Sequence, residues 1–199
     1  MTCMPSLRKS PSTLLASEEG MAFVEFALTV SVLLLLFLGS VEVSRYVLIM
    51  QKVEKIAQTA ADVVTQANPN SAPLTNTEMA QIMGAVQDMM NPYTFGANGL
   101  VIVTDVTQAG ANNPIVNWQY CGGGTLVAVS KLGNTIGGPA TLPAGYTMIA
   151  GEEVVISEVF YNFTPITTSR WSVMGASQMY RNSIFMPRLG ALTGYSSHC

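Results

Sequence analysis

The stretch that decides this fold is Gly20-Met-Ala-Phe-Val-Glu-Phe-Ala-Leu-Thr-Val-Ser-Val-Leu-Leu-Leu-Leu-Phe-Leu-Gly-Ser-Val41. It is apolar around its whole circumference. At a rise of about 1.5 Å per residue, a helix of this length crosses a bilayer. A helix lying on the membrane surface would need a polar face, which this stretch lacks. The stretch therefore predicts one transmembrane helix over residues 21–41.

Glu25 is the one ionisable residue between Gly20 and Val41. A carboxylate in hydrocarbon costs roughly 2.5–3.5 kcal/mol on insertion scales, so we expect it to have a partner. No Lys, Arg or His lies within one helical turn of it in the sequence. The best candidate is the α-amino group that Met21 would acquire if the chain were cut after Gly20. Four residues of helix separate the two groups by about 6 Å along the axis.

These residues are compatible with cleavage after Gly20 and also with an uncleaved signal anchor. An anchor accounts for the length of the apolar stretch but leaves Glu25 unexplained. A secretory signal peptide fits less well, because Leu38-Gly-Ser-Val41 is a poor match to the small-residue pattern of its cleavage site.

Gly20 followed by Glu25-Phe26 resembles the processing site of type IV pilin-like proteins. In that class a prepilin peptidase cuts after the glycine, and a glutamate stands fifth in the mature chain. The Val-Glu-Phe-Ala block, the leucine run and the exit segment Gly39-Ser-Val-Glu-Val-Ser-Arg45-Tyr46 are similar to TadE-like pseudopilins of the tight-adherence (Flp) pilus system. The resemblance covers about residues 18–66. Residues 180–188, Tyr-Arg-Asn-Ser-Ile-Phe-Met-Pro-Arg, resemble the closing strand of that family.

This resemblance implies a minor pilin-like subunit that is needed to assemble a Tad/Flp-type adhesive pilus. Residues 1–20 would be a leader peptide, cut between Gly20 and Met21, and Glu25 and Phe26 would serve subunit assembly. The implied partners are a prepilin peptidase, other pilin-like subunits, pilus assembly proteins and membrane lipid. The alternative is an uncleaved single-pass anchor protein whose outer domain binds a partner in a secretion apparatus.

The exit segment places Glu42, Arg45 and Tyr46 at the membrane interface, where snorkelling cations and aromatic rings are typical. The processing motif and the large C-terminal part imply a cytoplasmic N-terminus, a single pass through the inner membrane and a periplasmic domain. The positive-inside rule does not decide this orientation, because Lys and Arg flank both ends of the stretch.

The composition suits a membrane helix joined to one moderate domain. Charged residues make up 11% of the chain, hydrophobic residues 49%, and the net charge is −3. This charge excludes a basic nucleic-acid surface. Cys3 lies in the leader, so Cys121 and Cys199 form the available pair in an exported domain. We expect a disulfide, which would add about 4 kcal/mol by chain entropy; two separate buried thiols are the alternative.

The helical pattern continues beyond the membrane stretch. Apolar residues recur at three- and four-residue steps until Asn68-Pro69, which predicts an extramembrane continuation over residues 42–67. Thr75 and Glu78 form a capping box that opens a shorter helix ending near Met90. Its methionine stripe is typical of ordinary core.

Residues 68–199 are expected to form a small α+β domain. Strands are predicted at residues 100–106, 115–120, 153–163 and 177–186, and residues 125–129 could continue the pairing. The fold class is therefore α+β, with a small antiparallel sheet packed on the distal half of a long N-terminal helix.

The sequence contains no arrangement typical of catalysis. Gly122-Gly-Gly124 lacks the Lys-Ser/Thr of a phosphate-binding loop and predicts a tight turn. Glu152 and Glu153 are neighbours on a strand and point to opposite faces, which favours a solvated edge over a carboxylate pair. One His and two exported Cys cannot assemble a zinc site. We therefore expect no enzyme activity, no cofactor and no metal.

Overall fold

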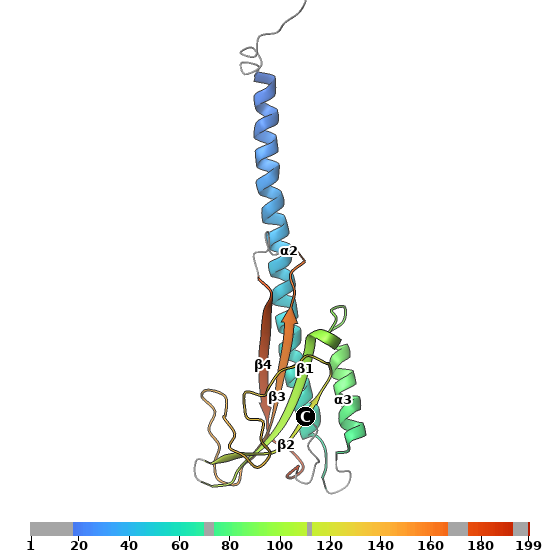
Figure 1. Cartoon of the computed structure of the whole chain (residues 1–199), viewed down its shortest axis with the longest axis vertical. Helices are drawn as coiled ribbons and strands as arrows, with labels where there is room; N and C mark the ends of the chain where they lie inside the picture. Colours follow the sequence, from blue (N-terminus) through green and yellow to red (C-terminus); the bar gives the residue numbers. More distant parts are fainter. Residues whose placement is uncertain (1–17, 70–73, 111–112, 167–174, 193–198) are drawn as a thin grey trace, which may run out of the picture.

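A computed structural model describes residues 18–69, 74–110, 113–166, 175–192 and 199 of the chain. Most of the predicted leader, residues 1–17, lies outside this part. The elements are α2 (Glu18–Thr65), α3 (Asn76–Asp88), the short 3-10 helix η1 (Gly96–Asn98), β1 (Gly99–Gln108), β2 (Pro114–Gly122), β3 (Glu153–Phe163) and β4 (Ser177–Phe185). Figure 1 shows one long helix that projects from a small domain built around its other half. The predicted α+β class is confirmed.

Helix α2 has 48 residues and is about 70 Å long. Its first half is long and apolar enough to cross a membrane. The helix ends two residues before the predicted Ala67, because the last turn tightens: the amides of Gln66 and Ala67 donate to the carbonyls of Val63 and Val64.

The sheet has the order β2-β1-β3-β4, and every neighbouring pair is antiparallel. The predicted bounds of β3 are confirmed at both ends, and β4 ends one residue before the predicted Met186. A bulge between Asp105 and Val106 shifts the register against β2 and leaves Asn117 outside the pairing.

The main core lies between the sheet and the distal half of α2. From α2 the side chains of Ile49, Val53, Ile56, Ala60 and Val64 are buried against it. Strands β1 and β3 supply Val101, Val103, Val155 and Val159, whose β-branched side chains suit a pleated, buried face. This packing fixes the direction in which the free half of α2 leaves the domain.

Helix α3 covers the side of this core. Its predicted capping box is present: Thr75 Oγ1 accepts from the amide of Glu78, and Glu78 Oε2 accepts from the amide of Thr75 at 2.9 Å. Met79 and Met83 are buried in the core, as the methionine stripe predicted.

The outer face of the sheet is covered by the long excursion between β2 and β3. The expectation that residues 125–129 continue the strand pairing is wrong. This segment is tied by the amides of Thr125 and Leu126 to the carbonyls of Gly96 and Gly99, and it packs Leu126 and Ala128 on the sheet. Because residues 125–129 place these apolar side chains on the face of the sheet, they do not pair with its edge strand.

Candidate assembly helix and its junction with the domain

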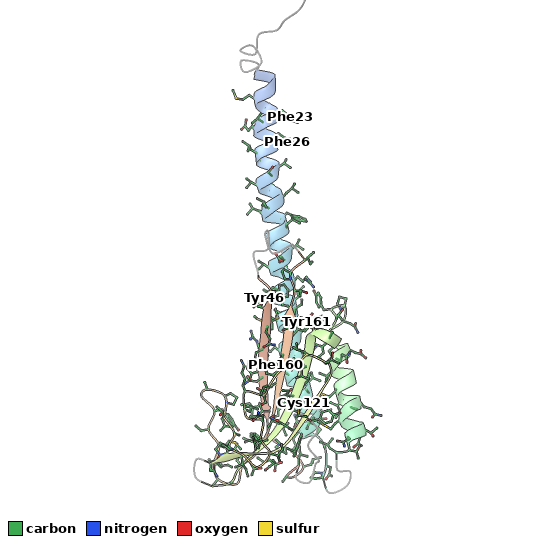
Figure 2. All side chains as sticks on the ribbon, in the orientation of Figure 1. Phe23, Phe26, Tyr46, Cys121, Phe160 and Tyr161 are labelled. Carbon is green, nitrogen blue, oxygen red and sulfur yellow. A yellow bond between two sulfur atoms is a disulfide. The ribbon has the colours of Figure 1, made fainter. Side chains whose placement is uncertain are left out.

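The first half of α2 makes no core with the domain. Its large side chains are exposed, with Met21 at 69%, Phe23 at 75% and Phe26 at 65%. Figure 2 shows Phe23 and Phe26 on the free part of the helix, far from the sheet. So many exposed apolar side chains on one helix mark a surface that meets lipid or other protein.

Glu25 lies on this free part, one helical turn from Met21, and its side chain is exposed. The hydroxyls in the same stretch are satisfied within the helix, since Thr29 donates to the carbonyl of Glu25 at 2.9 Å and Ser31 donates to Ala27 at 2.8 Å. Such bonds let hydroxyl groups enter hydrocarbon without loss of a partner. Between Met21 and Val41, Glu25 is therefore the one ionisable side chain, and it is exposed.

Gly20 and Met21, the predicted cleavage pair, are both helical and exposed. Glu25 and Phe26 follow on the next turn. The backbone thus brings the four residues predicted for processing and assembly onto about two turns at the free end of the helix.

Glu42 lies where the free half of α2 enters the domain. The sequence placed it at the membrane interface, but its side chain is 2% exposed and belongs to the buried part of the chain.

Arg45 and Tyr46, also predicted for the membrane interface, contact the domain. Arg45 Nη1 donates to the carbonyl oxygen of Thr164 at 2.9 Å, and its guanidinium lies 5.6 Å from the ring centroids of both Tyr93 and Phe163. Tyr46 meets Phe163 edge-to-face at 5.2 Å. Figure 2 shows Tyr46 at this junction. Both residues therefore fasten α2 to the end of β3, whatever their depth relative to lipid.

Lys52 is a second link that sequence reasoning missed. Its ammonium donates to the carbonyl of Met89 at 3.1 Å and to that of Asn91 at 2.8 Å. These carbonyls follow the end of α3, where unpaired acceptors and the helix dipole favour a cation. Lys52 therefore holds the end of α3 against α2.

Cys121 and Cys199 are joined by a disulfide with a Cα–Cα distance of 5.0 Å. The bond connects the end of β2 to the last residue of the chain, across a separation of 78 residues. Beside it, the predicted glycine turn is required by the backbone: Gly123 has a φ of 76°, and a Cβ on Gly124 would lie 2.1 Å from the carbonyl oxygen of Gly99.

The outer face of the sheet contains a buried carboxylate, Glu158, which the sequence did not single out. It is 0% exposed, and its Oε1 accepts from the amide of Lys131 and the hydroxyl of Tyr180, both at 2.9 Å. Ser130 donates to Oε2. The Lys131 ammonium lies 3.7 Å from the centroid of the Tyr180 ring. Burial and the Glu158 carboxylate raise the pKa of Tyr180 well above its usual value.

This arrangement anchors a loop. The three donors around Glu158 come from β4 and from the excursion, so the carboxylate ties that excursion to the sheet. Among the described residues, no group of three or more His, Cys, Asp or Glu side chains is placed to hold a metal ion.

Glu152 and Glu153 are both half-buried, and each also accepts hydrogen bonds. Glu152 accepts from the hydroxyl of Tyr146 at 3.0 Å and from the amide of Ile149 at 2.8 Å. Glu153 accepts from the amide of Leu192 at 2.6 Å. Both carboxylates hydrogen-bond to loops at the start of β3. A strand pattern does not reveal these partners.

The chain thus combines a free apolar helix, on which Glu25 is exposed, with a small α+β domain at the base of that helix. The family model described as TadE-like protein matches residues 20–62. The match begins at Gly20 and ends within the distal half of α2, so the predicted TadE-like resemblance is confirmed over this helix. No curated protein and no solved structure matches the chain. The similarity therefore connects the chain to proteins of the Tad pilus system through α2.

Proposed function

We propose that this chain is a minor pilin-like subunit that supports assembly of a Tad/Flp-type adhesive pilus. A prepilin peptidase would remove residues 1–20, leaving Met21 as the new N-terminus. The mature chain would stay in the inner membrane through residues 21–41, with its domain in the periplasm, until it joins other pilin-like subunits.

The observation that carries this proposal is the free half of α2, where Glu25 is exposed one turn from Met21. In lipid, a lone carboxylate and a lone ammonium are both unfavourable, and the low dielectric strengthens their mutual attraction. The amine released at Met21 could neutralise Glu25 of the same chain or of a neighbouring subunit. A pairing between chains would set the stagger between adjacent helices.

Complementation of a strain that lacks this gene tests the proposal. Glu25→Ala should insert into the membrane at least as well as the natural chain, because it removes a charge, yet it should abolish pilus output. Glu54→Gln, an acid-to-amide change on an exposed position of the same helix, is the matched control and should restore pili. Normal pilus output with Glu25→Ala would contradict the pairing.

A further inference from the structure

The C-terminal strap, residues 186–192, crosses the end of α2. The amide of Arg188 donates to the carbonyl of Thr65 at 3.2 Å, and the Arg188 side chain forms an ion pair with Asp62. These contacts hold the middle of the strap to the last turn of the helix. Because the ion pair lies at the surface, we expect it to contribute less to the attachment than the buried end of the strap.

Leu192 is that buried end. Its amide donates to Glu153 Oε1 at 2.6 Å, and its carbonyl accepts from the indole nitrogen of Trp118 at 2.8 Å. The Leu192 side chain belongs to the main core. Glu153 on β3 and Trp118 on β2 therefore hold the strap through hydrogen bonds to Leu192.

A second carboxyl group, Asp105, lies beside Glu153 on the helix-facing side of the sheet. Asp105 pairs with Val155 and Thr107 with Glu153, so the two acids are diagonal neighbours on adjacent strands. Asp105 is 0% exposed. Its Oδ2 accepts from Asn117 at 2.8 Å, whereas its Oδ1 is buried without a hydrogen-bond partner.

No cation compensates these two acids among the described residues around them. Where the strap meets the end of α2, Asp62 and Arg188 pair with each other. Strand β2 contributes Asn117 and Trp118, which are uncharged. Asp105 is buried and Glu153 is half-buried. Ionising both carboxylates without a cation is costly, and a proton between them removes the repulsion.

We propose that Asp105 and Glu153 share one proton in the folded chain, and that this proton latches the C-terminal strap onto the end of α2. The proton sits on Asp105 Oδ1, which then donates to Glu153 in place of remaining an unpaired acceptor. Glu153 accepts from the amide of Leu192. Loss of the proton makes both groups negative, and Glu153 relieves the repulsion by turning away, which releases Leu192.

The electrostatics agree with this geometry. Burial, opposed by the hydrogen bond from Asn117 and reinforced by the charge of Glu153, raises the pKa of Asp105 to about 8. The latch is therefore closed in acidic and neutral medium and opens as the pH rises through about 8. The domain would thus sense the alkalinity of its surroundings at the end of α2 remote from the membrane segment.

NMR of the full chain in detergent micelles tests this latch through the indole N–H of Trp118, identified by its loss in Trp118→Phe. In the natural chain the chemical shift of this signal should change as the strap is released, with a midpoint near pH 8. Asp105→Asn carries a permanent donor, so its signal should not move between about pH 6 and about pH 9.5. Asp88→Asn, at an exposed site on α3, should behave like the natural chain.

A second variant keeps the test decisive if Asp105→Asn folds poorly. Glu153→Gln removes the neighbouring charge and can donate to Asp105, so the midpoint should fall by about one unit or more. A Trp118 chemical shift that does not change with pH in the natural chain would contradict the shared proton. So would a midpoint in either variant that equals that of the natural chain.

Discussion

Arg45 on α2 donates a hydrogen bond to the carbonyl of Thr164, a residue 119 positions later in the chain, at 2.9 Å. This bond joins the helix to the end of β3 at the point where the apolar half of α2 leaves the domain. A force or a displacement applied to that half therefore reaches the sheet through Arg45 and the aromatic rings around it.

Arg45→Ala should lower the free energy of unfolding of the domain by about 1–2 kcal/mol, because it removes one hydrogen bond and two cation–π contacts. Arg45→Lys should recover less than half of this, since an ammonium lacks the planar surface of a guanidinium. Denaturant unfolding of the detergent-solubilised chain measures both. The exposed Lys55→Ala is the control and should stay within about 0.5 kcal/mol of the natural chain. Equal effects of the Arg45 and Lys55 variants would show that the junction adds no stability.

Tyr180→Phe should destabilise the domain by about 1–3 kcal/mol, because it removes a donor from the buried Glu158. Tyr146→Phe removes a similar bond to Glu152, which is partly solvated, and should have the smaller effect. Thermal unfolding of the two variants side by side provides the comparison. A larger loss for Tyr146→Phe would mean that Glu158 does not hold the excursion.

Because Cys121 and Cys199 form one disulfide, we expect substitutions of either residue to have the same effect on stability. Cys121→Ser and Cys199→Ser should each lower the free energy of unfolding by about 4 kcal/mol, since either change opens the same 78-residue loop. The double variant should add little to either. Unequal single variants, or reaction of Cys121 or Cys199 themselves with a maleimide in the absence of reductant, would argue against the bond.

Stability should fall as the pH rises from about 4 to about 8, because the folded chain retains the proton on Asp105 after the unfolded chain has lost it. Above about pH 8 both states have lost that proton, so this contribution levels off. Chemical unfolding at a series of pH values measures the slope. In Asp105→Asn the slope between these limits should be markedly smaller, and an unchanged slope would assign the pH dependence to other groups.

Much of the architecture was predictable because local signals agreed. Residues 153–163 are rich in β-branched and aromatic side chains and are bounded by Gly151 and Pro165, and the strand has the predicted bounds. The capping box at Thr75 likewise marked the start of α3. In both places the residues that define the element are close together in the sequence.

The contacts of Arg45, Glu158 and Glu153 could not be predicted in the same way. Each depends on a partner that tertiary packing brings from a distant segment: Thr164, the excursion at Ser130 and Lys131, and Leu192. The sequence showed polar side chains beside apolar stretches, which is typical of a membrane interface or a solvated strand edge. The sequence pattern does not reveal the partners that these distant segments supply.

The intact mass of the protein purified from the membranes of its own cells tests the account most directly. If α2 is the assembly helix of a pilin-like subunit, the chain begins at Met21, and the amine of that residue is available to Glu25. A mass that still includes residues 1–20 would contradict processing, and with it the pairing on which the proposed assembly role depends.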